Sequence, residues 1–291
     1  MSDKQNVGVV GLGQIGMPLA KNLLAAGFNV IGCNRSGSAE LEEQGGTWTA
    51  SPAEVTRQCD IVITVLPFES SLRAVFDGPD GLDAPNKQGL IVIELCTLPL
   101  SAKHWAAERL AAAGGVMLDC PISGYPAMVE AKQAIIFVSG DEAAAKACNA
   151  VFDGCTDKHV YLGEFGVGSK LKFVANLLVG VHMVATAEAL ALAEKAGLDM
   201  PRTVEILSNS AAASNMLKNR APVMRDRDFD NVRARVEVIH KDLKAISEFS
   251  HELGATTPLL DASFSAYSQA IDSGLAKKDM AAIYNVLAGT V

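Results

Sequence analysis

The sequence predicts an α/β fold: an N-terminal Rossmann domain with a doubly wound parallel sheet, then an all-helical C-terminal domain joined by a long interdomain helix. In the first half, continuous apolar runs of strand length, such as Asp60–Leu66 and Leu90–Ile93, alternate with helical stretches. Such runs are buried on both faces, which is typical of parallel strands. The alternation stops near Gly163. From Ser169 to Lys195 an apolar helical stretch runs without a turn, and only helices follow.

The expected elements of the first half can be placed individually. Strands are predicted at Val7–Val10, Phe28–Cys33, Asp60–Leu66, Leu90–Ile93, Val116–Asp119, Ala134–Val138 and His159–Leu162, and the clearest helices at Pro18–Ala26, Ser101–Ala113 and Asp141–Val151. We therefore expect an N-terminal domain over residues 1–164 and a helical domain over 165–291. The apolar surface of residues 169–195 exceeds what one small domain covers, which predicts a homodimer or a homotetramer.

Composition and charge exclude several classes of protein. The formal net charge is −8, which argues against a nucleic-acid surface. No run approaches the roughly 18 uninterrupted apolar residues of a membrane span. The first strand begins within about six residues of Met1, so we expect no secretory signal. The six cysteines form no CxxC pair, so neither a metal site nor a disulfide framework is indicated. We expect buried thiols in a reducing, cytoplasmic location.

A glycine-rich turn follows the first strand. Its residues are Gly11, Leu12, Gly13, Gln14, Ile15 and Gly16, which match GxGxxG between a strand and a helix. The first glycine permits the tight turn, the second lets the backbone approach a pyrophosphate, and the third lets the helix sit close to the strand. The phosphates then meet the positive end of that helix. The turn predicts a dinucleotide site.

The end of the second strand favours NADP over NAD. An NAD enzyme usually carries a carboxylate there to hold the ribose 2′-hydroxyl. This chain has Asn34, Arg35 and Ser36 instead. The guanidinium can donate to a 2′-phosphate and the serine can add a hydroxyl. NADP is therefore the preferred cofactor, NAD is possible, and the alternative for Arg35 is a solvated loop arginine.

Four further residues are candidates for cofactor contact. Leu66, Pro67 and Thr97 stand just past the carboxyl ends of two later strands, and Ser71 follows the first of them. Ligands of open α/β sheets bind along that edge. The alternatives are an ordinary strand end for Leu66-Pro67 and a helix-capping hydroxyl for Thr97.

Three more segments carry a family resemblance. DCPISG at 119–124 is similar to the DAPVSGG substrate motif of the β-hydroxyacid dehydrogenases. GVGSKLKFVAN at 166–176 matches their GxGxxxKxxxN motif, and HKDL at 240–243 resembles their C-terminal KDL motif. With the glycine turn, four motifs stand in the family's order over essentially the whole chain. The chain thus resembles enzymes that include 3-hydroxyisobutyrate dehydrogenases, tartronate semialdehyde reductases and glyoxylate/succinic semialdehyde reductases.

The resemblance implies a function and its residues. It implies hydride transfer between NADP(H) and a small carboxylate substrate, a β-hydroxy acid or semialdehyde, with Lys172 as proton donor and acceptor and Asn176 as its substrate-binding partner. The spacing agrees, because residues four apart share a helix face, and a partly desolvated lysine can have its pKa lowered towards working pH. Lys170, two positions away, faces elsewhere. Ser123 and Gly124 would anchor the substrate carboxylate, and Lys241 would reach the cofactor from the second domain.

The sequence departs from the family's motifs at three places. Tyr125 stands where the second glycine of SGG is usual, which should narrow the pocket or add a donor, and Lys132 replaces a later glycine. Ala234 lies where an aromatic is frequent, between Arg233 and Arg235, which serve an acidic substrate or belong to a solvated face. These changes bear on the substrate and leave the reaction class unaffected.

Two other functions remain alternatives. An imine reductase has the same fold, NADPH and a long interdomain helix, but such enzymes generally lack the lysine found here at position 172. A non-catalytic dinucleotide-binding module would have lost that lysine or gained an appended domain.

Overall fold

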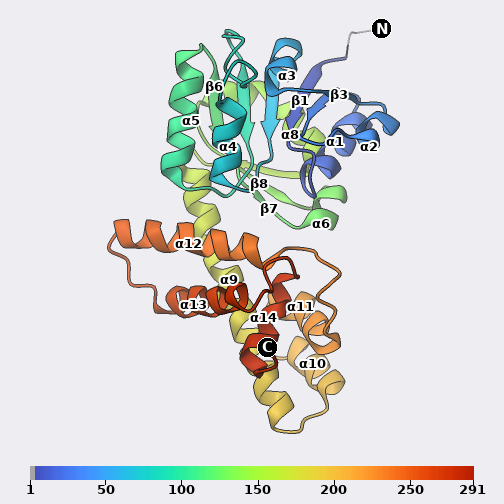
Figure 1. Ribbon diagram of the computed structural model, residues 1–291, viewed down its shortest axis with the longest axis vertical. Helices are drawn as coiled ribbons and strands as arrows, with labels where there is room; N and C mark the ends of the chain where they lie inside the picture. Colours follow the sequence, from blue (N-terminus) through green and yellow to red (C-terminus); the bar gives the residue numbers. More distant parts are fainter. Residues whose placement is uncertain (1–3) are drawn as a thin grey trace. The chain divides into compact units, whose positions relative to one another are not determined.

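The N-terminal unit is built on a parallel sheet. The computed structural model describes residues 4–291, shown as a ribbon in Figure 1. The sheet has six strands in the order β3-β2-β1-β4-β5-β6. Their bounds are β1 Asn6–Val10, β2 Asn29–Cys33, β3 Thr47–Thr49, β4 Ile61–Thr64, β5 Ile91–Glu94 and β6 Val116–Asp119. All the pairings are parallel, as the continuous apolar runs predict.

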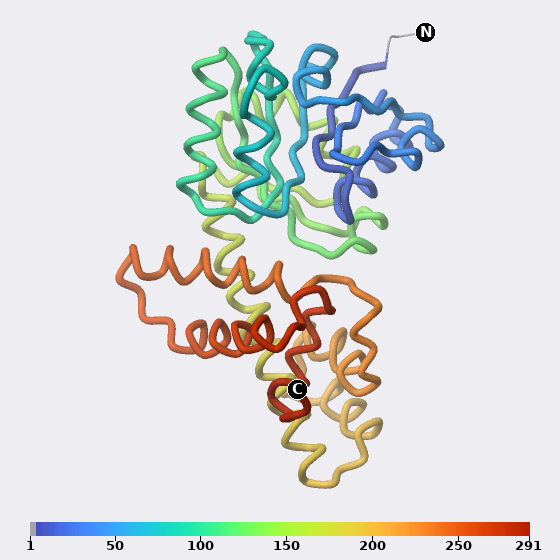
Figure 2. The backbone as a smooth tube through the Cα atoms, viewed as in Figure 1, coloured from blue at the N-terminus to red at the C-terminus, as the bar shows by residue number. Residues whose placement is uncertain are grey.

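Helices cover both faces of this sheet. Successive side chains of a strand point to opposite faces, and those of the central strands are apolar on both, so each face must be buried. Val9 and Ile63 belong to one apolar cluster, with helix α1 (Gly16–Ala25), whereas Val10 and Val62 belong to the other. The second cluster contains side chains from α3 (Pro52–Gln58), α4 (Glu69–Phe76) and α5 (Leu100–Ala112). A short α2 (Ala39–Glu43) precedes β3. The path of the chain through these layers can be followed in Figure 2.

The last strands of this unit form a second sheet, so the prediction that they continue the parallel sheet is wrong. Strands β7 (Ile122–Ser123), β8 (Ile135–Val138) and β9 (Lys158–Tyr161) have the order β7-β8-β9, with β7 antiparallel to β8. β6 is the edge strand of the six-stranded sheet, and its last residue, Asp119, forms an antiparallel bridge with Ser139, directly after β8. Helix α6 (Pro126–Glu130) then reverses the chain between β7 and β8.

The helix predicted over Asp141–Val151 is two helices. These are α7 (Glu142–Ala147) and α8 (Asn149–Cys155), which meet at Cys148. The Cys148 N–H is shared between the carbonyls of Ala144 and Ala145, the tightened geometry of a helix end. The apolar pattern continues through the break, since Val151 and Phe152 pack in the same core as Ala144, so periodicity alone did not reveal it.

The C-terminal unit is entirely helical among the residues that the structure describes. Contacts divide the chain into 1–172 and 173–291, a division that falls inside helix α9 (Val167–Lys195). The other helices are α10 (Met200–Ser208), α11 (Asn215–Asp226), α12 (Val236–Glu252), α13 (Pro258–Asp272), the 3-10 helix η1 (Met280–Ala282) and α14 (Ile283–Ala288). A buried ion pair between Arg220 and Asp279 joins α11 to the start of η1. The all-helical second half and the long α9 confirm the predicted architecture.

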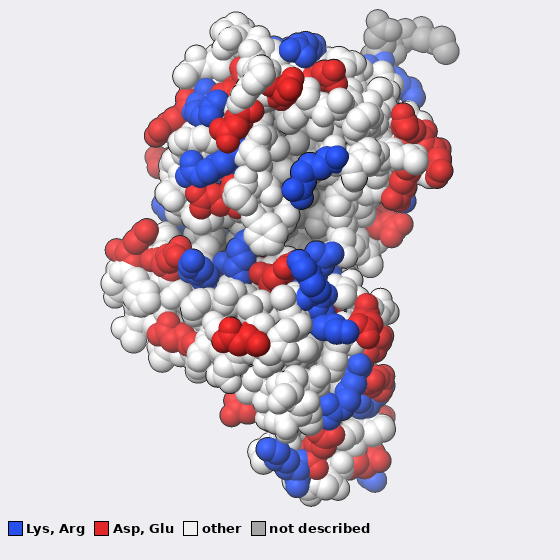
Figure 3. All heavy atoms as spheres, viewed as in Figure 1, with Lys and Arg blue, Asp and Glu red and all other residues white. Residues whose placement is uncertain are grey.

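Helix α9 is the one described helix long and apolar enough to cross a membrane by length and composition. This is weak support for a span, because the core helix of a soluble protein passes the same test. Ser169, Lys172, Asn176 and Thr186 are buried polar side chains on α9, and the first of these hydrogen-bonds within the N-terminal unit. Acidic and basic side chains are interspersed over the face shown in Figure 3.

The six cysteines are free thiols. Five are buried and Cys96 is partly buried. Burial raises the pKa of the Cys33 thiol to about 11 and that of Cys59 to about 12. At neutral pH these thiols are therefore protonated and poorly reactive. The cytoplasmic location stays a prediction.

Candidate active site

The glycine turn lies where the sequence predicts it, between β1 and α1. The order of the strands reverses at β1 and β4, so this turn stands at the crevice where open α/β sheets bind ligands. The Gly11 N–H donates to the Cys33 carbonyl, which ties the turn to the end of β2. The N-terminal residue of α1 provides no side-chain cap, so the helix's first N–H groups remain suited to an anion.

The three glycines of the turn have different surroundings. A Cβ at Gly16 would lie 1.9 Å from the Gly11 carbonyl oxygen, and one at Gly11 would lie 2.1 Å from the Val65 oxygen. A Cβ at Gly13 would meet no protein atom within 4 Å. Gly11 and Gly16 are therefore required by the fold, whereas the open space over Gly13 fits a dinucleotide pyrophosphate lying against the backbone.

The residues predicted to choose the cofactor follow β2. Arg35 and Ser36 are exposed, and no described feature fixes their side chains against the sheet. Asn34 is partly buried, and its Oδ1 accepts a hydrogen bond from the Trp48 indole of β3 at 3.2 Å. The loop is thus anchored at Asn34, and its next two residues are presented to solvent at the carboxyl edge of the sheet.

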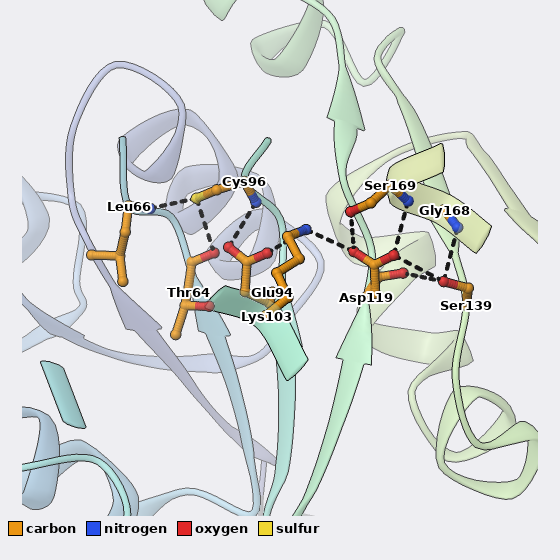
Figure 4. Close-up of polar contacts among 9 residues, drawn as sticks. All are labelled: Thr64, Leu66, Glu94, Cys96, Lys103, Asp119, Ser139, Gly168 and Ser169. Atoms are coloured by element: carbon orange, nitrogen blue, oxygen red, sulfur yellow. Dashed lines mark hydrogen bonds and ion pairs between the residues drawn. The ribbon is translucent and has the colours of Figure 1, made fainter. Parts of the chain in front are cut away.

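The other cofactor candidates lie on two neighbouring loops at the same edge. Leu66 and Pro67 follow β4, Ser71 is in the first turn of α4, and Thr97 follows β5. The Leu66 N–H donates to the Cys96 sulfur, and the Cys96 N–H donates to Glu94 Oε1 at 2.9 Å (Figure 4). The thiol therefore joins the loop after β4 to the loop after β5, a connection that the sequence did not reveal.

A buried lysine stands between two carboxylates just behind these loops. Lys103 Nζ lies 2.6 Å from Glu94 Oε2 and 2.6 Å from Asp119 Oδ1, and all three side chains are fully buried (Figure 4). Glu94 ends β5, Asp119 ends β6, and Lys103 is in the first turns of α5. Removing one member of such a buried pair costs about 3–5 kcal/mol, because the partner charge is left uncompensated.

The ionisation of this cluster follows from its contacts. Burial by itself would lower the pKa of Lys103, but the attraction of Asp119 and Glu94 outweighs it and raises that pKa. Burial by itself would raise the pKa of Asp119, but the Lys103 charge and the hydrogen bonds from Lys103 and Ser169 lower it below 3.8. Lys103 and Asp119 are thus both charged at neutral pH, and Asp119 loses its stabilising contribution only as acid protonates it.

Asp119 also holds the first turn of α9. The Ser169 N–H donates to Asp119 Oδ2 at 2.8 Å and the Ser169 hydroxyl to Oδ1 at 2.7 Å. The Gly168 N–H donates to the Ser139 hydroxyl, which in turn donates to Asp119. A Cβ at Gly168 would lie 2.5 Å from the Phe137 carbonyl oxygen, so only glycine lets the helix approach this closely. A carboxylate here also interacts favourably with the helix dipole.

The predicted catalytic pair follows on the same helix. Lys172 lies three residues after Ser169 and Asn176 four residues after Lys172, and each is 7% exposed. Lys170, the neighbour that the spacing sets aside, is exposed. One face of α9 therefore carries a buried lysine and a buried amide, which are suited to meet one substrate oxygen.

Asp242 was missed as a site residue. Its Oδ2 accepts a hydrogen bond from Asn176 Nδ2 at 2.8 Å, and its Oδ1 lies 2.8 Å from Lys241 Nζ. The buried carboxylate thus brings together two predicted residues, from α9 and α12, within the C-terminal unit. Its position directly after Lys241 in the KDL motif was the sequence feature that pointed to it.

The residues predicted to bind the substrate carboxylate lie around β7. Ser123 ends β7, Gly124 is exposed, and Tyr125 is the partly buried N-cap residue of α6. Lys132 has a φ of 57°, in the left-handed region that favours glycine. Here the Lys132 ammonium donates to the Asp153 carbonyl at 2.7 Å, an anchor that glycine could not provide.

The segment that contains Arg233 and Arg235 is held by contacts within the C-terminal unit. Arg233 and Ala234 donate their backbone N–H groups to Asp279 Oδ2. The Arg235 guanidinium lies 3.3 Å from Glu237 Oε1 on the surface. These contacts favour the solvated-face interpretation for Arg235.

Comparisons with known proteins agree with this arrangement over the whole chain. Residues 6–163 match the family model of the NAD binding domain of 6-phosphogluconate dehydrogenase. Residues 166–287 match the family described as NAD-binding of NADP-dependent 3-hydroxyisobutyrate dehydrogenase. An L-threonate dehydrogenase of Cupriavidus necator is 33% identical over 98% of this chain and 97% of its own. This chain belongs to the β-hydroxyacid dehydrogenase family.

Two further comparisons place the chain within that family. Glyoxylate/succinic semialdehyde reductase 1 of Arabidopsis thaliana is 31% identical over 95% of this chain and 96% of its own. The crystal structure of a 3-hydroxyisobutyrate dehydrogenase from Salmonella typhimurium superposes with a TM-score of 0.90 at 28% identity, covering 97% of this chain and all of that one. The chain is thus an oxidoreductase for NAD(P)-linked hydride transfer on hydroxy acids.

The imine reductase alternative shares the fold alone. An imine reductase from a Pseudomonas species is 21% identical, with a TM-score of 0.64, and covers 98% of this chain and all of that one. Both values are lower than those for the Salmonella dehydrogenase. Because the two kinds of enzyme share this fold, the topology alone does not separate their activities. The feature of this chain that argues against an imine reductase is the lysine at position 172.

Alanine substitutions at Gly13 and Gly16 should separate cofactor binding from folding. In Gly13→Ala we expect wild-type thermal stability but weaker NADPH binding, because the methyl group occupies the space that a pyrophosphate needs; such overpacking costs about 1–3 kcal/mol. In Gly16→Ala the methyl group meets a backbone oxygen, so the folded yield and melting temperature should fall. Thermal unfolding and fluorescence titration with NADPH measure both effects. Undiminished NADPH affinity in Gly13→Ala would place the pyrophosphate elsewhere.

Proposed function

We propose that this enzyme transfers a hydride between NADP(H) and a small β-hydroxy acid or its semialdehyde, with Lys172 as the general acid and base. The observation that carries the proposal is the burial of Lys172 and Asn176 one turn apart on α9. Residues four apart share a helix face, so the lysine and the amide can meet one substrate oxygen. During oxidation the substrate hydroxyl must lose its proton, and a lysine amine at that oxygen can accept it.

The proton and the hydride take separate routes. When bound, the nicotinamide accepts the hydride from the alcohol carbon or returns it to the carbonyl carbon. In the oxidative direction the O–H bond breaks, its proton goes to the neutral Lys172 Nζ, and the electron pair left on oxygen forms the carbonyl. In the reductive direction the Lys172 ammonium returns that proton to the oxygen.

Asn176 orients the same substrate oxygen. One N–H of its Nδ2 donates to Asp242 at 2.8 Å, which fixes the orientation of the amide, and its Oδ1 can then accept a hydrogen bond from the substrate hydroxyl. Asp242 in turn is charge-paired with Lys241, the residue proposed to reach the cofactor. The carboxylate therefore acts on both neighbours, fixing the amide's orientation through one oxygen and the ammonium through the other.

The substrate is a small carboxylate anchored by Ser123 and Gly124. L-Threonate, glyoxylate and succinic semialdehyde, which appear in the names of the relatives, are all small acids. A Cβ at Gly124 would lie 2.7 Å from the Cβ of Ala134, the residue before β8, so glycine is required at this position. Its absence of a side chain keeps the backbone N–H groups after β7 close to β8. Tyr125, next along, is proposed to narrow the space above the anchor and so to select among these acids.

The preference for NADP rests on the loop after β2. Arg35 and Ser36 are exposed there and Asn34 is held by Trp48, which supports a 2′-phosphate site at the surface. No carboxylate occupies positions 34–36 to repel the phosphate. The guanidinium supplies the charge and the fork of donors that such a phosphate requires.

We expect the purified enzyme to oxidise NADPH with at least one acid among glyoxylate, succinic semialdehyde and tartronate semialdehyde, or to reduce NADP with L-threonate or 3-hydroxyisobutyrate. Lys172→Ala should lower kcat on that substrate by about 10²–10⁴-fold, the usual contribution of a general acid or base. NADPH affinity should remain near that of the wild type. Absorbance at the nicotinamide band measures turnover, and fluorescence titration measures binding.

Lys170→Ala is the matched control, because it removes an exposed lysine two positions away on the same helix. It should keep the wild-type kcat. A Lys172→Ala enzyme with more than about a tenth of the wild-type kcat would contradict the acid–base role, since such groups contribute far more.

Tyr125→Gly, assayed on the same substrates, should change their relative kcat/KM values, because the tyrosine ring is proposed to narrow the space above the carboxylate anchor. If the kcat/KM values of all the substrates change by one common factor, Tyr125 has no part in substrate selection.

Arg35→Ala should raise the KM for NADPH about 10- to 100-fold, because a charge-assisted hydrogen bond contributes about 1.5–3 kcal/mol. The KM for NADH should change little. Arg57→Ala is the control. Arg57 is an exposed arginine in the last turn of α3, just before the amino end of β4, whereas Arg35 follows the carboxyl end of β2. Equal use of NADH and NADPH by the wild type would overturn the proposed preference.

We extend the proposal to a homodimer or homotetramer. Leu171, Val174 and Leu178 recur at helical spacing on α9 and are 39%, 58% and 49% exposed, and Leu192 is 70% exposed. A row of exposed apolar side chains is typical of a protein interface. Light scattering at micromolar concentration should give a multiple of 30.5 kDa; a mass near that of one chain would refute the assembly.

A further inference from the structure

The buried cluster of Glu94, Lys103 and Asp119 has no step in the proposed mechanism. Its three side chains are fully buried, so none of them meets a substrate from solvent. Desolvating three charges is costly, and well-packed apolar residues in such a place are often as stable. The feature that distinguishes the cluster is the set of groups to which its two carboxylates are bonded.

Glu94 connects the cluster to the loops proposed to hold the cofactor. Its Oε1 accepts the Cys96 N–H at 2.9 Å, and the Cys96 sulfur accepts the Leu66 N–H. Leu66 and Thr97, the next residue after Cys96, are both candidate cofactor contacts. The glutamate therefore fixes the backbone of the loop after β5 and, through the thiol, that of the loop after β4 (Figure 4).

Asp119 connects the cluster to the helix that carries Lys172. Both of its carboxylate oxygens bond the first turn of α9, through the N–H and the hydroxyl of Ser169. Ser169 and Lys172 are three residues apart, so they lie on the same side of the helix. A rotation or a slide of this first turn would move the Lys172 ammonium with it.

We propose that Lys103 is a positioning residue that fixes the first turn of α9, and with it Lys172, relative to the cofactor-binding loops after β4 and β5. Its ammonium lies 2.6 Å from each carboxylate. Lys103 therefore connects the bonds that Glu94 makes to the loops with the bonds that Asp119 makes to α9. We call the cluster, together with its bonds to Cys96 and Ser169, the array. The array acts through Lys172, so this inference rests on the proposed function. All its members lie within residues 1–172, the N-terminal unit.

Ser169→Ala tests the array with a small change. It removes the 2.7 Å bond from the hydroxyl to Asp119 and keeps the bond from the Ser169 N–H. We expect kcat to fall on the order of 10-fold, since even a 1 Å misplacement can cost about 10²-fold. The KM for NADPH should stay near the wild-type value. Ser169→Thr keeps a hydroxyl at this position and should recover most of the lost kcat.

Ser263→Ala is the matched control. Ser263 is 2% exposed, compared with 1% for Ser169, and its hydroxyl donates to the Leu259 carbonyl within α13. Both variants should show similar, small losses of melting temperature, but only Ser169→Ala should lose kcat. Equal kcat in the two variants at matched stability would overturn the positioning role. Equal losses of kcat in both would also overturn it, because activity would then follow general stability.

Lys103→Met tests the centre of the array. If the variant folds, its kcat should fall at least as far as that of Ser169→Ala, and its KM for NADPH should rise, because Glu94 no longer holds the cofactor loops. A folded Lys103→Met enzyme with wild-type kcat and KM would overturn the proposal. Should this variant fail to fold, the comparison of the serine variants still decides.

The outcomes separate this inference from the proposed function. Activity retained in Lys172→Ala overturns the catalytic role and, with it, a positioning role that acts through Lys172. An inactive Lys172→Ala together with a fully active Ser169→Ala leaves the catalytic role in place and removes only the positioning role. Hydrogen exchange of the first turn of α9 gives a readout without turnover: it should be faster in Ser169→Ala than in Ser263→Ala, and equal exchange contradicts the array.

Discussion

The ion cluster around Lys103 is the interaction on which the N-terminal unit's arrangement depends. The Lys103 ammonium faces two acidic side chains, and all three side chains are fully buried. Backbone donors complete the contacts of the two acids, from Cys96 to Glu94 and from Ser169 to Asp119. The partial positive charge at the start of α9 also favours the Asp119 carboxylate. The contacts of Asp119 are therefore complete only when the helix begins where it does.

This requirement explains why the division of the chain by contacts falls inside α9. The first turn of the helix is bonded to Asp119 and Ser139, and Gly168 packs against the backbone of Phe137, so residues up to Lys172 belong with the sheets. Asn176, one turn later, is bonded to Asp242 of α12 and belongs with the helices. Within the N-terminal unit a carboxylate thus holds the helical turn that precedes Lys172, and within the C-terminal unit another carboxylate holds Asn176.

The sequence predicted what depends on local pattern and failed where distant pairing decides. Alternating apolar runs predicted the parallel sheet, and the glycine turn lies where its spacing places it. Lys172 and Asn176, predicted from spacing and resemblance, are both buried on α9, and their roles stay predictions. The second sheet was missed, because the pairing of β7 with β8 depends on partners that periodicity does not name. Lys103 was not singled out, since nothing in the sequence around it shows that Glu94 and Asp119 end adjacent strands. Asp242 was overlooked for the same reason: its partner Asn176 is 66 residues away.

The chemistry of the cluster indicates that it serves to orient the first turn of α9 more than to stabilise the fold. A packed apolar replacement would avoid the desolvation of three charges, and such replacements in other proteins are neutral or stabilising. Apolar contacts, however, are non-directional, and a helix held by them alone can rotate or slide with little penalty. Carboxylate bonds of 2.7–2.8 Å to both the N–H and the hydroxyl of Ser169 set the helix's rotation as well as its position. An acid–base group needs that restriction, because proton transfer requires its donor and acceptor within hydrogen-bond reach at the moment the hydride moves.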